Sequence, residues 1–266
     1  MTGGLPLPVP AEAETVITVG GTGSALGSLR LVAALYEKSH PGVTIRIMPS
    51  LGSAGGIKAA IGGGIDLALS SRRLTESERQ QGATEVEYAR TPFAFITNAK
   101  NSKKNITIAE LEHIYADPEP RWTDGSRIRV VLRPEKDIDT TLIRNLSPGM
   151  EQAMRSAQAR PGMIMAISDQ ESTEAIMKTP GAFGCATLSE IISEKRQVNV
   201  LTFNGVKPEV RNIARGTYSL FKSQYLVTTP KTSSAARQFA EFVRSRSAGN
   251  ILSSVGNMLV TSKQEP

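Results

Sequence analysis

The strongest constraint on the fold is the regular alternation of strand-like and helix-like segments in the first 75 residues. Residues 15–20, 43–50 and 65–71 are short apolar or alternating runs typical of strands, whereas residues 25–42 and 56–64 have helical patterning. This β-α-β-α-β order predicts parallel strands covered by helices, which is an α/β architecture.

Each of the three predicted strands ends in a short polar loop. The loops read Thr22-Gly23-Ser24, Gly52-Ser53-Ala54 and Ser70-Ser71-Arg72. Ligands of open α/β sheets bind beyond the carboxyl ends of the strands. We therefore expect these three loops to lie at one edge of the sheet and to form part of a binding site.

The first loop suits an anion for a physical reason. The first turn of a helix has unpaired N–H groups and partial positive charge, and glycine lets a ligand approach the backbone. The alternative is that Ser24 only caps the helix. The loop matches neither the dinucleotide-binding nor the P-loop motif, because no lysine follows it and no acidic residue closes the second strand.

Charged residues near two strand ends add further candidates. Arg72 follows the third strand, where it is expected either to bind an oxyanion or to pair with a surface acid. Arg133 closes the strand predicted at 127–134 and is expected to be buried or to line a cleft. Asp137 and Asp139 follow it; they are either functional carboxylates or, in the case of Asp139, the cap of the next helix.

Composition excludes several classes of function. Lysine and arginine are spread along the chain (31, against 25 acids), and aromatics make up 5% of residues, so we expect no nucleic-acid binding. One cysteine and two distant histidines give no basis for a disulfide, a metal site or a catalytic triad. We expect no cofactor, no transmembrane helix and, in residues 1–14, no signal peptide.

Two long extended runs, near residues 90 and 222, suggest a division into lobes. They bracket a middle segment, so the predicted organisation is a flexible lead at 1–14, lobe 1 at 15–93 with 219–263, and lobe 2 at 94–218. We expect the ligand to bind between the lobes. Donors from hydroxyl and N–H groups, one or two arginines, and the expected absence of lysine and histidine together favour binding of a small oxyanion over catalysis.

Several stretches resemble the phosphate-binding proteins of bacterial ABC importers. The similarity extends over about residues 15–260 and is carried by VGGTGSALGSLRLVAALYE, LGSAGGIKAAIGGGIDLALSSRRL, LRPEKDIDTTL and PFAFITNAKNSKKNITIAELEHIYADPEPRWTDG. The resemblance implies a class II periplasmic-binding-protein fold, with two lobes, each a mixed sheet flanked by helices, and two hinge strands.

The resemblance also implies ligand-binding positions. Serines at the first two loops match Ser24 and Ser53, with the backbone of Gly23 or Ala25 nearby; the arginine matches Arg133 and the hydroxyl after it Thr140. 

Two positions depart from the family: the third loop, and the second-lobe loop, which is often Ser-Gly-Thr in the family and reads Asp137-Ile138-Asp139-Thr140 here. Ser71, followed by Arg72, stands where well-known members have an aspartate that accepts the proton of phosphate, so we expect an acceptor, if one exists, at Asp137 or Asp139. A carboxylate beside an anion is repulsive unless the anion donates a proton to it, which hydrogen phosphate does and sulfate does not.

The resulting hypothesis is a periplasmic solute-binding protein for phosphate or a similar oxyanion. It would be a monomer without catalytic residues, would dock the membrane permease of an ABC importer, and would have its export signal outside this chain. The alternatives are a ligand-sensing module of the same fold, which the sequence does not distinguish, and an enzyme acting on phosphate esters.

Overall fold

The computed structural model describes residues 14–260. The lead predicted at 1–14 therefore lies outside the described residues except for Glu14. The strands are β1 (Thr15–Gly21), β2 (Val43–Ile47), β3 (Leu67–Ser70), β4 (Thr84–Asn98), β5 (Asn105–Ile106), β6 (Arg129–Leu132), β7 (Ile164–Met165), β8 (Ala182–Thr187), β9 (Val198–Val200), β10 (Thr202–Phe203), β11 (Phe221–Thr228) and β12 (Met258–Leu259).

The helices connect and cover these strands. They are α1 (Gly23–Ser39), α2 (Gly52–Gly62), α3 (Glu76–Gln80), α4 (Ile108–Ala116), α5 (Ile138–Arg144), α6 (Pro148–Ala159), α7 (Asp169–Lys178), α8 (Leu188–Ser193), α9 (Val210–Ala214), α10 (Ser234–Val243) and α11 (Arg246–Ser254). The Thr-x-x-Glu spacing predicts capping boxes at Thr75–Glu78 and Thr107–Glu110, and Ser147 followed by Pro148 predicts a helix start. Both boxes are present, and Ser147 caps α6 with Pro148 as its first residue.

The first α/β unit forms as predicted. β1 pairs in parallel with both β2 and β3, and the path continues through β11, β4, β8 and β6 to β7. β11 is antiparallel to β3 and to β4, and β4 is antiparallel to β8, whereas β8, β6 and β7 are parallel. Both halves of the sheet are therefore mixed, as expected.

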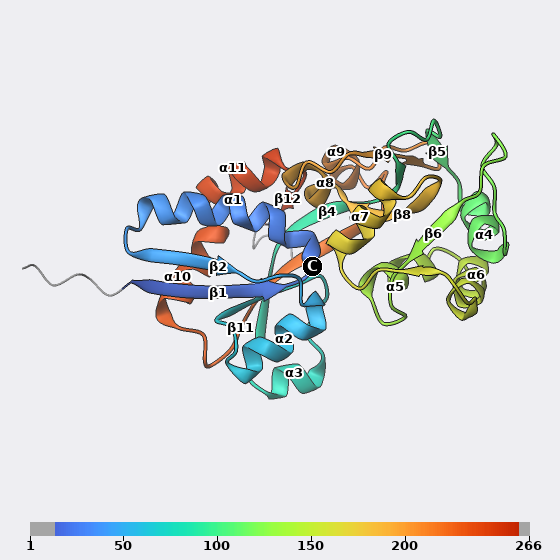
Figure 1. The fold of residues 1–266 in the computed structure, drawn as a ribbon. Helices are drawn as coiled ribbons and strands as arrows, with labels where there is room; N and C mark the ends of the chain where they lie inside the picture. The colour runs from blue at the N-terminus through green and yellow to red at the C-terminus, as the bar shows by residue number, and fades with distance from the viewer. Residues whose placement is uncertain (1–13, 261–266) are drawn as a thin grey trace, which may run out of the picture.

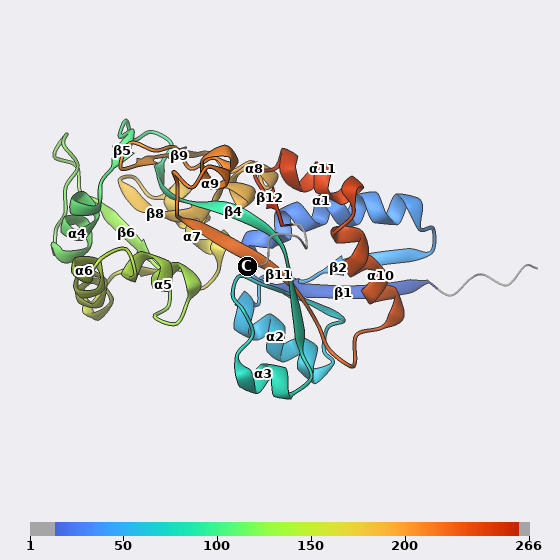
Figure 2. The same ribbon diagram turned by 180° about the vertical axis from the view of Figure 1, so that it is seen from behind.

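β4 belongs to both halves. It pairs with β11 up to Pro92 and with β8 from Phe93 onward. In Figures 1 and 2, β4 and β11 lie between one group of helices, α1, α2, α3, α10 and α11, and another, α4, α5 and α6. The two long extended runs of the sequence are thus adjacent antiparallel strands that connect the two lobes.

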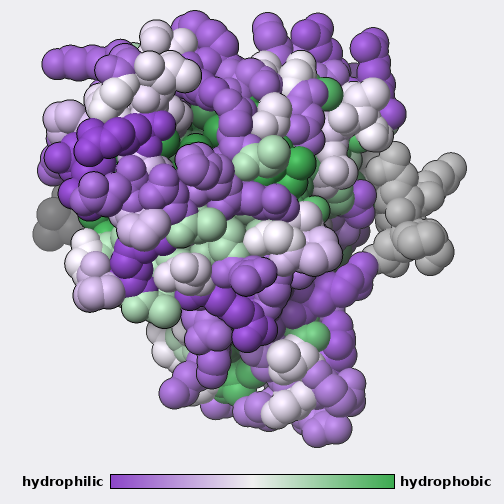
Figure 3. Space-filling model, turned by 90° about the vertical axis from the view of Figure 1, so that its right-hand side faces the viewer, coloured by the Kyte–Doolittle hydropathy of each residue, from purple (hydrophilic) through white to green (hydrophobic). Residues whose placement is uncertain are grey.

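Hydrophobic packing follows the same division. Two clusters of buried core residues come from positions up to Ala89 and from Leu226 onward, and two others from positions 93 to 220. The lobe boundaries expected from the sequence, 15–93 with 219–263 and 94–218, stay a prediction, and Phe93 and Leu220 pack with the second pair of clusters. The face of the second lobe in Figure 3 is mostly hydrophilic, with scattered apolar patches.

Candidate functional site

Hydroxyl groups from the first and third strand ends form one buried cluster. Thr22 Oγ1 lies 2.9 Å from Ser71 Oγ, and Ser24 Oγ lies 3.1 Å from both. The second loop joins it, because the Ser71 N–H donates to Ser53 Oγ at 2.9 Å. The three loops therefore meet at one edge of the sheet, as the sequence predicts.

Helix α1 begins two residues earlier than a cap at Ser24 would require. Thr22 is the N-cap residue, and its side chain makes no capping hydrogen bond, so the alternative role of Ser24 as the cap is wrong. Gly23, Ser24 and Ala25 are the first three helical residues, and the Ala25 N–H makes only a long contact of 3.4 Å with the Thr22 carbonyl. The hydroxyls thus surround a helix N-terminus that they do not cap.

The glycines of the first loop also have a packing role. Gly21 has φ of 142°, and a Cβ there would lie 2.0 Å from the Leu69 carbonyl oxygen of β3. A Cβ on Gly56 of α2 would lie 2.6 Å from the Gly21 Cα. Close approach of β1, β3 and α2 therefore requires glycine at these positions whatever binds nearby.

Arg72 pairs with an acidic side chain, Glu78, which is the second of the two roles expected for it from the sequence. Its guanidinium donates to both carboxylate oxygens of Glu78, at 2.7 and 2.8 Å, and this hydrogen bonding lowers the pKa of Glu78 to about 2. Arg72 nevertheless lines the pocket described below. It is an already paired cation at the pocket edge.

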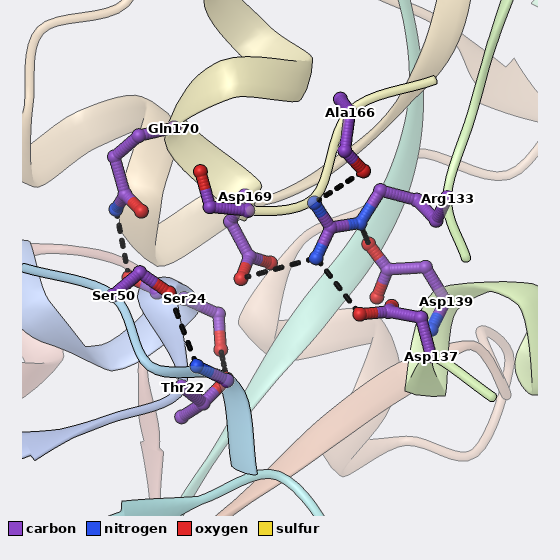
Figure 4. Close-up of polar contacts among 12 residues, drawn as sticks. Thr22, Ser24, Ser50, Arg133, Asp137, Asp139, Ala166, Asp169 and Gln170 are labelled. Carbon is purple, nitrogen blue, oxygen red and sulfur yellow. Dashed lines mark hydrogen bonds and ion pairs between the residues drawn. The ribbon is translucent and has the colours of Figure 1, made fainter. Parts of the chain in front are cut away.

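Arg133 is buried on the opposite wall, at the end of β6. Its Nη1 donates to the Ala166 carbonyl at 3.2 Å and its Nη2 to Asp137 Oδ2 at 2.9 Å. Its Nη2 is 3.8 Å from Asp169 Oδ2, and its Nε is 3.7 Å from Asp139 Oδ2 (Figure 4). Burial disfavours the charged guanidinium, but these carboxylates outweigh that effect and raise the pKa of Arg133.

Of the three predicted site residues after Arg133, Asp137 faces the pocket, whereas Asp139 and Thr140 are buried behind it. Asp137 lines the pocket and is the N-cap of α5, where it accepts the Asp139 N–H at 2.9 Å, so Asp139 is not the cap. Asp139 is almost fully buried. The Thr140 hydroxyl donates to the carbonyls of Arg133 and Pro134 at 3.1 and 2.9 Å, and is bonded within its own loop.

The expectation of a site without lysine is wrong. Lys222, in the middle of β11, is buried and ion-paired through Nζ with Asp139 and with Asp169, the latter at 2.8 Å. The clue in the sequence is a single charge inside the extended run YSLFKSQYLVTT. Asp169 was also missed, because SDQE reads as an ordinary helix start, and Asp169 is indeed the first residue of α7.

The buried charges differ in how easily they are neutralised. Burial raises the pKa of Asp139 to about 6, although Lys222 opposes the rise. Burial acts on Asp169 in the same direction, but Lys222 and Arg133 outweigh it and lower the pKa of Asp169. Burial and the nearby Asp169 charge raise the pKa of Glu190, behind the site on α8, to about 8.

A pocket of about 230 Å³ lies between these two walls. It is lined by Thr22, Leu51, Gly52, Ser53, Ala54, Gly55, Arg72, Arg133, Pro134, Lys136, Asp137, Ile138, Asp169 and Lys222. Of the ten predicted ligand-binding residues, Ser53, Arg72, Arg133 and Asp137 line it directly. Ser24 and Ser71 lie behind it, hydrogen-bonded to the pocket-lining Thr22.

Over residues 14–260, no group of three or more His, Cys, Asp or Glu side chains is arranged to hold a metal ion. None of the helices described in that range is long and apolar enough to cross a membrane.

A polar pocket between two mixed α/β lobes joined by two strands defines the class of two-lobed binding proteins. The family model described as the PBP superfamily domain matches residues 8–247, and the chain belongs to this superfamily.

Individual relatives agree with this assignment. The chain is 25% identical over 242 residues to the phosphate-binding protein PstS of Bacillus subtilis, covering 88% of this chain and 77% of that protein. 

Solved structures share the fold. One is a substrate-binding protein of Clostridium perfringens, assigned to a phosphate ABC transporter and holding phosphate, with a TM-score of 0.78, 21% identity and coverage of 93% of this chain and 100% of that one. The periplasmic molybdate-binding protein of Azotobacter vinelandii superimposes with a TM-score of 0.63 at 16% identity, covering 92% of this chain and 100% of that one.

Proposed function

We propose that this protein is a solute-binding protein that captures phosphate or a similar small oxyanion between its lobes for an ABC importer. The observation that carries the proposal is the pairing of two walls across one pocket. The Thr22 hydroxyl and the start of α1 lie on one wall, and the buried Arg133 guanidinium lies on the other. Hydroxyl, N–H and guanidinium groups are the donors that bind tetrahedral oxyanions in proteins.

The family supports the biological setting. The Bacillus subtilis relative is named a phosphate-binding protein. By analogy, we propose a periplasmic or other extracytoplasmic location, a monomer, and docking to the permease subunits of the importer. We also propose that the protein binds its ligand without chemistry. His40 stacks on Tyr36 and His113 is exposed beside Asp117, so both histidines lie apart from the pocket lining.

Calorimetric titration tests the binding proposal. Ligand-free protein, prepared by partial unfolding and dialysis, is titrated with phosphate, arsenate, sulfate, molybdate and methylphosphonate. We expect saturable binding of at least one of these anions at one site per chain. If none of them binds, the proposal is wrong.

A second assay tests the absence of chemistry. We expect no release of phosphate from p-nitrophenyl phosphate, with or without added divalent metals. Turnover that persists through purification would instead support an enzyme acting on phosphate esters.

A further inference from the structure

A second pocket, of about 240 Å³, lies in the second lobe and is lined by three arginines, Arg127, Arg129 and Arg160. It is at the opposite end of β6 from Arg133, because Arg129 begins that strand and Arg133 follows it, about 13 Å of extended chain away. In Figure 1, β6, α4 and α6 lie at the end of this lobe that is remote from β1 and β2. The pocket shares no lining residue with the one between the lobes and is separate from it.

Two of these guanidinium groups are held in place by main-chain carbonyls. Arg160, the C-cap residue of α6, donates through Nη2 to the carbonyls of Tyr115 and Ala116 at the end of α4, at 3.1 and 3.0 Å. Arg129 donates through Nη1 to the Pro180 carbonyl at 2.8 Å. These bonds fix both side chains but use one nitrogen of each guanidinium, which has five N–H donors in all, so other donors remain for a ligand.

The three arginines form no ion pair within residues 14–260. They differ in this from Arg155, which is on the same helix as Arg160 and pairs with Glu151 at 2.7 Å. The side chain of Arg127 is exposed and also makes no hydrogen bond in that range. An anion that enters the pocket therefore meets guanidinium groups that no carboxylate has neutralised.

The carboxylates of the loop between α4 and β6 have other partners. Asp117 accepts the Glu119 N–H at 2.9 Å, and Asp124 accepts the Ser126 N–H and hydroxyl at 2.9 and 2.6 Å. Glu119 is exposed, and its carboxylate lies 3.9 Å from the guanidinium of Arg121. None of these three carboxylates lines the pocket.

The rest of the lining is mostly apolar. It consists of Pro118, Pro120, Ile128, Val130, Gly162, Met163 and Ile164. Guanidinium groups bind carboxylate and phosphate through paired N–H donors, and apolar walls favour an apolar part of the ligand. The volume is below the roughly 300–1,000 Å³ of pockets that hold drug-sized molecules, so the ligand that fits is compact.

We propose that this arginine pocket is a second binding site, which takes a small organic anion with a carboxylate or phosphate group attached to a compact apolar body. The anionic group binds the guanidinium groups of Arg127, Arg129 and Arg160, and the apolar body packs against Met163 and Ile164. The inference does not depend on the proposed function, because the two pockets have no residue in common.

Methyl NMR on the full chain tests the site, with the labelled side chains of Met163 and Ile164 as local probes. Benzoate and phenyl phosphate are the two organic anions. Benzyl alcohol, which is neutral, and inorganic phosphate, which has no apolar body, are the controls. We expect saturable shifts of both methyl signals with at least one of the organic anions, and at least about threefold weaker binding of each control at this site.

The position of the probes separates the two pockets. Phenyl phosphate that binds only between the lobes leaves the Met163 and Ile164 signals unchanged. The inference is wrong if neither organic anion shifts these signals saturably. It is also wrong if benzyl alcohol or inorganic phosphate binds there as tightly as the organic anions do, because the pocket then does not select for both parts of the ligand.

The second test is the substitution Arg127→Gln, with Arg215→Gln as the matched control. Both arginines are exposed in the second lobe and form no ion pair within residues 14–260, but Arg215 does not line the pocket. Both variants should fold, because neither side chain is buried. We expect the dissociation constant of the organic anion, read from the same methyl signals, to rise at least about threefold in Arg127→Gln and to stay at the wild-type value in Arg215→Gln. Equal affinity of Arg127→Gln and wild type would contradict recognition by the arginines.

Discussion

Lys222 in β11 donates a hydrogen bond to Oδ1 of Asp169 at the start of α7, over 2.8 Å and in a buried environment. The two residues are 53 positions apart in sequence. Lys222 belongs to β11, one of the two strands that connect the lobes, and Asp169 belongs to the pocket wall. The contact therefore links that strand to the wall. It holds a buried carboxylate, whose pKa is lowered by Lys222 and Arg133, in the lining of the pocket.

Arg133→Ala is expected to remove most of the oxyanion affinity. The guanidinium is, with Lys222, one of two buried cations in the pocket lining. Hydrogen bonds to charged groups contribute about 1.5–3 kcal/mol each, so the dissociation constant should rise at least about tenfold. Calorimetric titration measures this. Arg155→Ala is the control, because Arg155 is exposed on α6 and, within residues 14–260, forms an ion pair only with Glu151. Affinity of Arg133→Ala within twofold of wild type would mean that the site is misplaced.

Lys222→Met is expected to destabilise the fold by about 3–5 kcal/mol at neutral pH, because Asp139 and Asp169 stay buried, lose Lys222 and keep the longer contacts with Arg133 of 3.7 and 3.8 Å. The loss should shrink toward pH 5. Asp139 already has a raised pKa of about 6, and without Lys222 it takes up a proton still more readily, which removes the unpaired charge. Urea unfolding at pH 5 and 7.5 measures the difference. Lys178→Met, at an exposed position, should change stability by less than about 0.5 kcal/mol.

Glu190→Gln is expected to change how stability depends on pH. The pKa of Glu190 is about 8 in the folded protein, against an unperturbed value of about 4.3. Between these two values the folded state keeps a proton that the unfolded state has released. The contribution of Glu190 to the free energy of unfolding is therefore fully present below about pH 4.3 and is lost as the pH rises toward 8. Glutamine stays neutral and can still accept from Thr173.

The free energy of unfolding of Glu190→Gln, relative to that of wild type, should therefore increase by a few kcal/mol between about pH 5 and 8. Above pH 8 the difference between the two proteins should stay constant. Unfolding midpoints in urea across this range provide the measurement. Parallel curves for the two proteins would show that Glu190 titrates normally in the folded state.

Gly21→Ala is expected to destabilise the protein by about 2–4 kcal/mol. The substitution combines a positive φ, unfavourable for alanine, with a Cβ 2.0 Å from a backbone oxygen that has little freedom to move. Gly62→Ala is the matched control, because a Cβ there meets nothing within 4 Å and alanine favours helix. Thermal unfolding compares them. Equal melting temperatures would show that the loop relaxes around the added methyl group.

Local patterns determined much of the fold. The alternation of segments predicted parallel pairing of β1 with β2 and β3, and Thr75, Thr107 and Ser147 marked helix starts correctly. These features depend on neighbours within a few residues, so the sequence displays them directly. The assignment of Ser24 and Asp139 as possible caps was wrong by two residues in each case, because Thr22 and Asp137 offer the same chemistry nearby.

The order of residues along the chain already shows that polar loops end three strands, that Arg133 closes a strand, and that glycines allow a close βα turn. Which charged residues become neighbours depends on the packing of the two lobes. Lys222 and Asp169 come from a long strand and a helix start that look ordinary in isolation, and they become partners because β4 and β11 bring the lobes together. Burial then makes their pairing obligatory, since an isolated charge in that position is far too costly.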